Sequence, residues 1–407
     1  MRKSLQRRLR YCFYSLILCV LFFGLLEIGA RLLLQQRGIE VGTYRYGVAV
    51  ADVLWAHPSW RLGWTGKPHW HGEIYDTHVT LNSRGHRAGE IVPRSDRELR
   101  ILLLGDSRIF GYALEANETI SASTQATLAQ LLPGQTVEVY NAGIPGHSSY
   151  QGRCVASSLL NDYRPDVAVF LYGFNDLRRA NLAPDSPAMM AVTGVMGWIN
   201  EFLRPMVRHS GFFTWAFYRE GHVDVTQAWG KPRVAADAYW QNVASFIRAA
   251  ADANALPVVL SVPFNPRLRR EMNAADSLLD RGEAQTAFAG YLKASDAIAA
   301  LLIRRHGARR LAETKHPDFS RQLLTAPVVP LAALHGGLLV SGEEPYRELE
   351  LPVDIMTKGV LLLLENELAD ERYYLDLGHL TAEGCRRVAD SLAHTIAQRF
   401  GPPDHGE

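Results

Sequence analysis

Three residues have the side chains of a nucleophilic catalytic triad: Ser107, Asp376 and His379. A serine hydroxyl is a poor nucleophile at neutral pH unless a neighbouring base takes its proton, and an imidazole serves well as that base. A carboxylate bound to the imidazole fixes its tautomer and stabilises the imidazolium, and Asp376 comes shortly before His379. These residue types predict acyl transfer through an acyl-serine, provided that the fold brings them together.

Short polar blocks follow three predicted strands. Ser107 ends the run Ile101-Leu-Leu-Leu-Gly-Asp-Ser107. After the next strand comes Asn141-Ala-Gly-Ile-Pro-Gly146-His-Ser, whose glycine can aim a backbone N–H inward. The third block is Gly173-Phe-Asn175-Asp176. Ligands of open α/β sheets bind beyond the carboxyl ends of the strands, so the order of these blocks predicts a site at that edge.

Each block also has a structural interpretation. Ser107 could cap a helix, Asn175 could be a turn residue, and Asp376 with His379 could start the helix at Thr381. Their joint occurrence in this order favours a site. We expect Asp106 and Asn141 to support the loops, while Asp176 could belong either to the site or to the supporting structure, with structure favoured.

The elements that must position these residues alternate between strand and helix. Apolar strands are predicted at 99–104, 137–140, 166–172 and 257–262, with a short alternating strand at 77–81 before them. Helices are predicted up to about 132, through about 162, at 235–253 and at 381–400. This alternation predicts an α/β fold, a three-layer α/β/α sandwich with a parallel, flavodoxin-like sheet.

Together the blocks resemble the four sequence motifs of SGNH (GDSL-like) hydrolases: GDS, a glycine-containing loop, GxND and DxxH. The segment Leu81-Asn-Ser-Arg-Gly-His-Arg87 is similar to the one that precedes GDS in membrane-anchored bacterial members. The resemblance covers about 79–262 and 373–400. It implies an oxyanion hole formed by the Ser107 N–H, the Gly146 N–H and the Asn175 side-chain amide. Two departures are Arg108, where the family usually has an apolar or aromatic residue, and a long insertion before Asp376.

The N-terminus predicts a membrane anchor. Five basic residues lie within positions 1–10, and a largely apolar run then extends from Tyr11 to Leu34. As a helix this run would be about 36 Å long, enough to cross the hydrocarbon core. The basic cluster predicts a cytoplasmic N-terminus and an exported remainder. A cleaved signal peptide is the alternative, but Ile28 stands where a small residue is expected before a cut at Ala30.

We therefore expect a basic tail (1–10), an anchor (11–34), an extracytoplasmic lead-in (35–95) and a hydrolase domain (96–400). The domain should contain insertions at about 178–234 and 267–350, the second including a helical hairpin at 274–302. Cys154 and Cys385 are expected to be buried, unbonded thiols, although a bond between them stays possible in an oxidising compartment.

The predicted activity is an extracytoplasmic serine esterase, with O-acetyl groups of an exported polysaccharide as the leading substrate. The alternatives are an O-acetyltransferase that uses the same triad and a non-catalytic polysaccharide-binding protein. No cofactor is expected. His69-Trp-His71 lacks a convincing third and fourth ligand, which argues against a metal. A net charge of +1 argues against nucleic acid as a partner.

Overall fold

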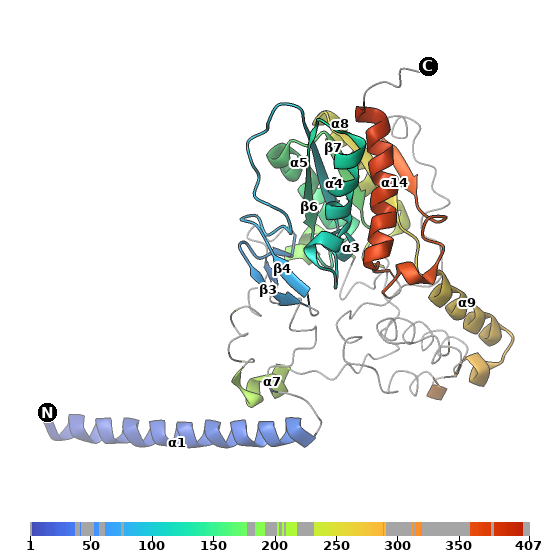
Figure 1. Ribbon diagram of the computed structural model, residues 1–407. Helices are drawn as coiled ribbons and strands as arrows, with labels where there is room; N and C mark the ends of the chain where they lie inside the picture. The colour runs from blue at the N-terminus through green and yellow to red at the C-terminus, as the bar shows by residue number, and fades with distance from the viewer. Residues whose placement is uncertain are drawn as a thin grey trace, which may run out of the picture.

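Most of the chain outside the two predicted insertions is described in the computed structural model (Figure 1). The described residues are 2–36, 41, 53–56, 62–74, 77–176, 184–191, 202, 206, 209–217, 232–287, 289, 311, 315–316, 318–319, 359–375 and 378–401. Of the predicted hairpin at 274–302, the first arm is described as part of α9 (Pro266–Asp280), and so are the turn and the start of a second helical arm up to 289. Ala284 and Ala287 of the second arm are buried against Ala275 and Leu279 of the first, and 290–302 lie outside the described residues.

A parallel sheet of five strands forms the centre of the fold. Its order is β6-β5-β7-β8-β9, and every neighbouring pair is parallel. The strands are β5 (Glu98–Gly105), β6 (Thr136–Gly143), β7 (Val167–Leu171), β8 (Leu256–Ser261) and β9 (Val360–Leu363). The four predicted strands are confirmed. The edge strand β9 was missed, although the apolar run 360–364 was a usable signal for it.

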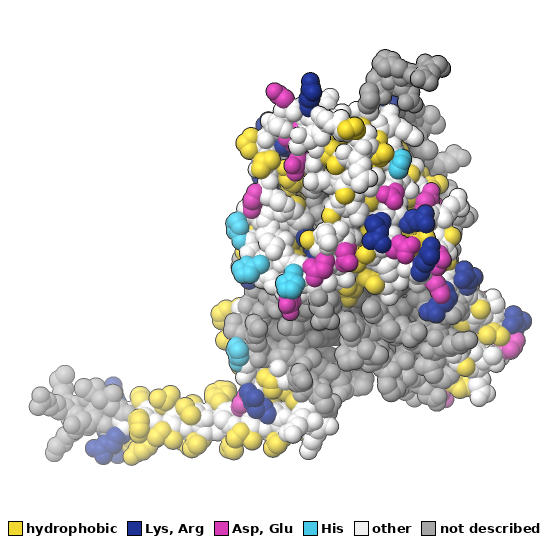
Figure 2. Space-filling view, in the orientation of Figure 1, with side chains coloured by type: hydrophobic (Ala, Val, Ile, Leu, Met, Phe, Trp, Pro, Cys, Tyr) yellow, Lys and Arg dark blue, Asp and Glu magenta, His cyan; other side chains and the backbone are white. Residues whose placement is uncertain are grey.

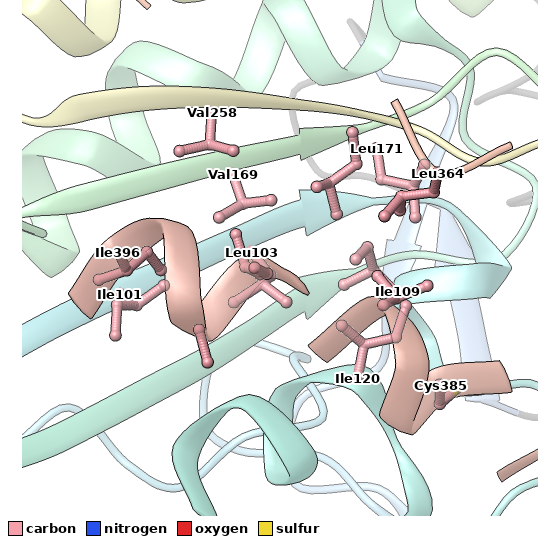
Figure 3. Close-up of a cluster of buried hydrophobic side chains, with 14 of the residues drawn as sticks. Ile101, Leu103, Ile109, Ile120, Val169, Leu171, Val258, Leu364, Cys385 and Ile396 are labelled. Atoms are coloured by element: carbon pink, nitrogen blue, oxygen red, sulfur yellow. The ribbon is translucent and has the colours of Figure 1, made fainter. Parts of the chain in front are cut away.

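Helices cover both faces of the sheet, which confirms the predicted three-layer sandwich (Figure 1). Alternate residues of β5 point to opposite faces. Ile101 and Leu103 pack with side chains of α4 (Ile120–Leu131) and α14 (Ala382–Phe400), as Figure 3 shows in part. Leu102 and Leu104 pack with α5 (Ser149–Tyr163) and α8 (Ala236–Asp252). All four leucine and isoleucine side chains are fully buried, and each such burial is worth about 1.5–3 kcal/mol.

The helices next to the site begin at capped residues. Asp106 caps α3 (Ser107–Phe110), Thr119 caps α4 and Thr381 caps α14, each by accepting a backbone N–H. Short 3-10 turns precede α4 and α14, η1 (Ala116–Glu118) and η4 (Glu371–Tyr373). These caps set where each site loop ends.

The described part of the lead-in forms two antiparallel pairs, β1 (Leu54–Ala56) with β2 (Trp64–Gly66), and β3 (His71–Ile74) with β4 (Thr77–Thr80). The alternating strand predicted at 77–81 is therefore confirmed as β4. Val79 and Leu81 pack in one buried cluster with Phe110 of α3. The lead-in thus supports the helix that carries Ser107.

Helix α1 (Arg2–Gln36) contains a segment, Arg10–Gln36, that is long and apolar enough to cross a membrane; a signal sequence would meet the same criterion. Figure 2 shows hydrophobic side chains along its exposed surface. A shorter helix, α7 (Gly211–Phe217), lies against α1.

The cysteine prediction is half right. Cys385 is a buried thiol, and burial raises its pKa to about 12. Cys154 is also unbonded to another cysteine, but it is exposed. The reason is its place on α5, whose buried residues face α8 and the sheet while Cys154 lies on the outer side.

Candidate active site

Three site loops leave neighbouring strands at the same level. Gly105, the last residue of β5, pairs with Gly143 of β6 and with Leu171 of β7. The backbone continues these contacts beyond the strands, because Ile144 N donates to Gly105 O at 3.0 Å and Asp106 N to Leu171 O at 3.4 Å. The loops bearing Ser107, Gly146 and Asn175 therefore start side by side, as the sequence predicted.

Ser107 is the first residue of α3, immediately after its cap. The cap is Asp106 rather than Ser107, so the interpretation of Ser107 as a helix cap is wrong. A side chain at Gly105 would place its Cβ 2.3 Å from Ile109 Cγ1 and 2.8 Å from Leu171 O, so only glycine allows this tight exit. The turn aims the hydroxyl of Ser107 at the loop before α14.

His379, which lies near the other end of the chain, contacts this hydroxyl. Its Nε2 lies 2.7 Å from Ser107 Oγ, and the residues are only 2% and 5% exposed. The imidazole stacks on Tyr112 at 4.3 Å between ring centroids and meets Phe174 edge-on at 5.6 Å. The short contact and the aromatic walls give a shielded hydroxyl–imidazole pair.

The histidine loop is closed by backbone hydrogen bonds. Leu375 N donates to His379 O at 2.8 Å, and Thr381 N donates to Tyr373 O at 2.9 Å. Asp376, the predicted orienter, lies outside the described residues, so its role stays a prediction.

The loop after β6 carries Gly146 in a left-handed conformation, with φ at +82°. A glycine adopts this conformation without strain. Asn175 Nδ2 donates to the carbonyl oxygen of the next residue, His147, at 2.9 Å, which joins the loops after β6 and β7. Asn175 is buried, and the amide nitrogen carries a second hydrogen.

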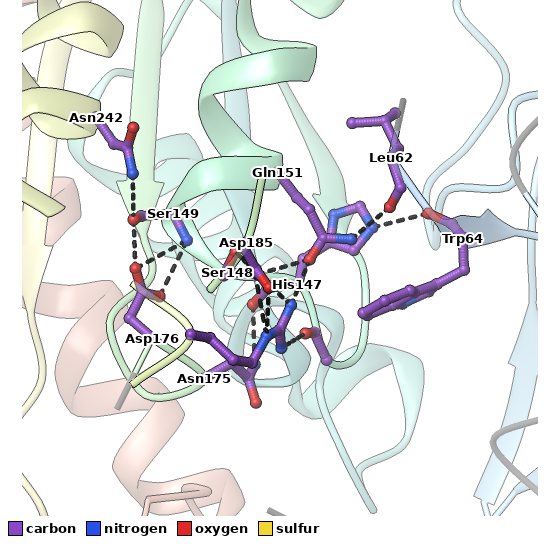
Figure 4. Close-up of polar contacts among 12 residues, drawn as sticks. Leu62, Trp64, His147, Ser148, Ser149, Gln151, Asn175, Asp176, Asp185 and Asn242 are labelled. Atoms are coloured by element: carbon purple, nitrogen blue, oxygen red, sulfur yellow. Dashed lines mark hydrogen bonds and ion pairs between the residues drawn. The ribbon is translucent and has the colours of Figure 1, made fainter. Parts of the chain in front are cut away.

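An arginine near the end of the first insertion, Arg233, donates to the Gly146 loop. Figure 4 labels two of its other partners, Gln151 and Asp185. Arg233 Nη1 donates to Gly146 O at 2.7 Å, and its Nη2 donates to Gln151 at 2.8 Å and to Asp185 at 2.8 Å. Its guanidinium also lies over the ring of Trp64, 5.5 Å from the centroid. Trp64 in turn donates to Pro145 O at 2.9 Å. Lead-in, core and insertion thus meet on one loop.

Asp176 supports the same region from beneath, as predicted. It accepts hydrogen bonds from the N–H and hydroxyl of Ser149 and from the Gly173 N–H. Burial raises the pKa of Asp176 to about 6, although the bonds from Ser149 act in the opposite direction. Asn242 donates to Ser149 Oγ at 2.9 Å and extends the network to α8.

The other two residues assigned to structure also support loops. Asn141 donates to Ile109 O at 2.6 Å and accepts from Gly143 N at 3.0 Å. Asp106 forms an ion pair with Arg108 at 2.9 Å, and the Arg108 guanidinium lies over Phe174. Arg108, the departure from the family pattern, is therefore a buried partner of the helix cap.

A second arginine, Arg87 of the lead-in, holds the far end of the serine loop. Its Nη1 donates to Phe110 O at 3.1 Å and Gly111 O at 2.8 Å, and its Nη2 donates to His78 O at 3.2 Å and Leu114 O at 2.7 Å. Burial lowers the pKa of Arg87 to about 10. Its four bonds join β4 to the turn that follows α3.

The residues that hold the loops in place were not predicted from the sequence. Arg87 belongs to a segment with a recognisable motif, but Trp64, Tyr112, Asp185 and Arg233 lie in stretches without a motif. Their partners are distant in sequence and were not readable from local pattern. Among the described residues, no group of three or more His, Cys, Asp and Glu side chains could hold a metal ion.

Comparisons with known proteins return remote similarities. No protein-family model matches the chain, and no curated protein matches it. Among solved structures, AlinE4, described as an SGNH-hydrolase family esterase, is 18% identical with a TM-score of 0.26. That match covers 43% of this chain and 65% of AlinE4, so the chain spans less than two thirds of that protein.

Two other solved structures are matched over nearly their full length. The esterase EstA from Pseudoalteromonas sp. is 12% identical, with a TM-score of 0.35 over 75% of this chain and 100% of EstA. A lipase/acylhydrolase from Enterococcus faecalis is 15% identical, with a TM-score of 0.33 over 74% of this chain and 97% of that one. AlinE4 is named for the same family that the four sequence blocks resemble. At such low scores, the case for a function depends on the geometry of the site itself.

Proposed function

We propose that this protein is a serine ester hydrolase with Ser107 as its nucleophile and His379 as its general base. The observation that carries the proposal is the 2.7 Å contact between Ser107 Oγ and His379 Nε2, made by buried side chains 272 positions apart. A helix cap needs no such partner, and Asp106 already provides the cap. The contact is the arrangement that activates a hydroxyl.

The reaction follows from this pair. His379 Nε2 takes the proton as Ser107 Oγ attacks the ester carbonyl, and the imidazolium then protonates the departing alcohol. Water, activated by the same imidazole, hydrolyses the acyl-serine and restores the hydroxyl. Asp376 is assigned to orient the imidazole and stabilise its charged form.

The oxyanion of the tetrahedral intermediate needs hydrogen-bond donors. We assign the Ser107 N–H, the Gly146 N–H and the second amide hydrogen of Asn175 to this role. Three features support the assignment: three neighbouring strands end at the same level, Gly146 has a left-handed φ, and the Asn175 amide donates a hydrogen bond to His147 O.

The decisive test is covalent labelling with a fluorophosphonate, which reacts with activated serines. Wild type should be labelled at Ser107, and Ser107→Ala should lose the label and lower kcat on a short aryl ester by at least about 10³-fold. Ser83→Ala, a change at an exposed serine, is the matched control and should keep both. Labelling of another serine in an active Ser107→Ala variant would overturn the assignment.

We assign O-acetyl groups of an exported polysaccharide as the substrate, with the catalytic domain outside the cytoplasmic membrane. This assignment depends on the apolar segment of α1, which is long enough to cross a membrane, and on the basic residues at the start of that helix. A reporter that is active only outside the cytoplasm, fused to the C-terminus, should give signal. An active cytoplasmic reporter at the same place would reverse the topology.

The O-acetyltransferase alternative shares every step up to the acyl-serine. The two reactions differ in the acceptor, which is water in one and a sugar hydroxyl in the other. Incubation of an acetylated glycan with an excess of unacetylated glycan separates them. Release of free acetate indicates the hydrolase, and transfer of acetate to the second glycan indicates the transferase.

A further inference from the structure

The charged pair of the anchor helix has a partner outside that helix. Glu27 and Arg31 pair with each other at 2.6 Å, one turn apart on α1. The Glu27 carboxylate also accepts hydrogen bonds from Ser210 Oγ at 2.6 Å, Gly211 N at 2.7 Å and Phe212 N at 3.0 Å. These donors stand at the start of α7, so the anchor carboxylate satisfies backbone groups of the first insertion.

The contact is close as well as polar. A Cβ on Gly211 would lie 2.5 Å from Arg31 Cγ, so α7 touches α1 where only glycine fits. Arg31 Nη2 adds a bond to His209 O at 2.9 Å. On α1, Ala30 and Leu34 are buried one turn apart, whereas large apolar residues earlier in the helix are exposed. One face near the end of the anchor is therefore covered by protein.

The position of the pair along α1 defines its depth. Glu27 lies sixteen residues after Tyr11, where the uncharged run begins, which is about 24 Å along a helix. A hydrocarbon core is about 30 Å thick, so the carboxylate would sit just inside the far boundary of the bilayer. A charge at that depth needs partners, and the start of α7 supplies them. The start of α7 must then lie at the same level.

The segment around α7 presents large apolar side chains outward. Phe202 is 71% exposed, Met206 39% and Trp215 45%. The Trp215 ring lies 6.4 Å from that of Phe212. Figure 1 shows α7 beside the C-terminal part of α1, away from the sheet. Aromatic side chains are enriched at the boundary between lipid and water, where an apolar ring can sit among headgroups.

We propose that the described residues 202, 206 and 209–217 form a second membrane-contact element, docked on the anchor by Glu27 and seated in the interfacial lipid of the outer leaflet. The occupant of the exposed face is the bilayer itself, because the face continues the lipid-facing surface of α1. The hydrogen bonds of Glu27 then hold the first insertion at the membrane surface. Arg233, which donates to Gly146, belongs to the same insertion. The proposal requires that α1 stay attached, independently of the esterase assignment.

Fluorescence quenching tests which medium surrounds Trp215. The full chain, with an N-terminal tag to verify that α1 is retained, is placed in phosphatidylcholine nanodiscs with or without brominated acyl chains. Brominated lipid should quench a fraction of the tryptophan emission that Trp215→Phe removes. Trp240→Phe, on α8, is the matched control and should leave that fraction unchanged.

Each other outcome contradicts the proposal. If the Trp215 emission is quenched by acrylamide in water and not by brominated lipid, the face is solvated. If neither agent quenches it, protein covers the face, and a second copy of the chain would be indicated by the mass of the particle.

A second variant tests the hydrogen bonds between Glu27 and the start of α7. Glu27→Gln keeps the size of the side chain but loses the charge and replaces one of the two acceptor oxygens with a donor. Hydrogen exchange of the Gly211 and Phe212 amides should become at least tenfold faster, and the lipid-quenched emission of Trp215 should fall. Unchanged exchange and unchanged quenching would show that Glu27 does not hold α7.

Discussion

The loop after β5 and the loop after β6 are each held by an arginine from outside the sheet, but by different means. Arg87 donates to four backbone carbonyls, and the charges of Glu115 and Glu118 only partly offset the effect of burial on its pKa. Arg233 forms a fork on the carboxylate of Asp185 and uses another nitrogen for Gly146 O. Arg87 donates hydrogen bonds to the carbonyl groups of a turn, and Arg233 fixes the orientation of a loop.

The difference predicts separate consequences. Loss of Arg87 leaves buried carbonyls without donors and should mainly cost stability. Loss of the Arg233 fork should leave the fold but displace the Gly146 N–H, which we assign to the oxyanion hole, and should therefore mainly lower the rate. We therefore expect Arg87 to contribute mainly to stability and Arg233 mainly to the orientation of the Gly146 loop.

The largest effect is expected at the oxyanion side itself. Asn175→Ala should lower kcat about 100- to 1000-fold with little change in KM, because the lost donor acts mainly in the transition state. Steady-state kinetics on a short ester measures both constants. Asn242→Ala removes a buried amide that donates to Ser149 in the network of Asp176, and should lower stability while leaving kcat within a few-fold. A kcat of Asn175→Ala near that of the control would remove Asn175 from the oxyanion hole.

Arg87→Met should lower the free energy of unfolding by about 2–4 kcal/mol, since several buried carbonyls lose their donor while the apolar stem is kept. Denaturant unfolding of the full chain in detergent measures it. Arg84→Met, which breaks an exposed ion pair with Asp162, should cost about 1 kcal/mol or less. Equal losses in the two variants would contradict a structural role for Arg87.

Arg233→Lys keeps the charge but cannot bond at once to Gly146, Gln151 and Asp185, because an ammonium is a point charge without the guanidinium fork. We expect kcat to fall about tenfold through a displaced Gly146 N–H. Arg100→Lys is the matched control: Arg100 also forms several buried bonds, but at the opposite end of β5. It should lower stability and leave kcat unchanged, and a similar kcat loss in both variants would argue against a specific effect on the loop.

The smallest effect concerns pH. Burial, with a smaller contribution from Arg84, lowers the pKa of His86 to about 4, and its Nδ1 lies 2.7 Å from Tyr163 Oη. Between pH 6.5 and 4, His86 takes up a proton in the unfolded chain but not in the folded chain. Its contribution to the free energy of unfolding is therefore complete above pH 6.5 and is lost as the pH falls. From pH 7 to 5.5 this residue should account for about 1 kcal/mol.

His86→Gln should remove that loss, which unfolding experiments at the two pH values can measure. His71→Gln, on the exposed edge of β3, should retain the wild-type pH dependence. A variant at 86 that loses stability between these pH values as steeply as wild type would show that another group is responsible.

The periodic parts of the fold were predictable. The strands β5, β6, β7 and β8 are apolar because both faces of the sheet are covered, and a continuous apolar run followed by a polar turn is a local signal. The position of Ser107, Gly146 and Asn175 after neighbouring strand ends was predictable for a related reason, because parallel strands end at one edge. The strand β9 was missed because the predicted insertion before it separates it from the regular alternation.

The sequence by itself determined which residues follow the strand ends and which residues begin the neighbouring helices. Both features depend on residues only a few positions away. Only the tertiary structure decided which distant groups hold them. The contacts of His379 with Ser107, of Arg87 with the turn after α3, of Arg233 with Gly146 and of Glu27 with α7 each join segments far apart in sequence. Hydrogen bonds and buried ion pairs of this kind have no period, and they exist only once the hydrophobic layers have brought their ends together.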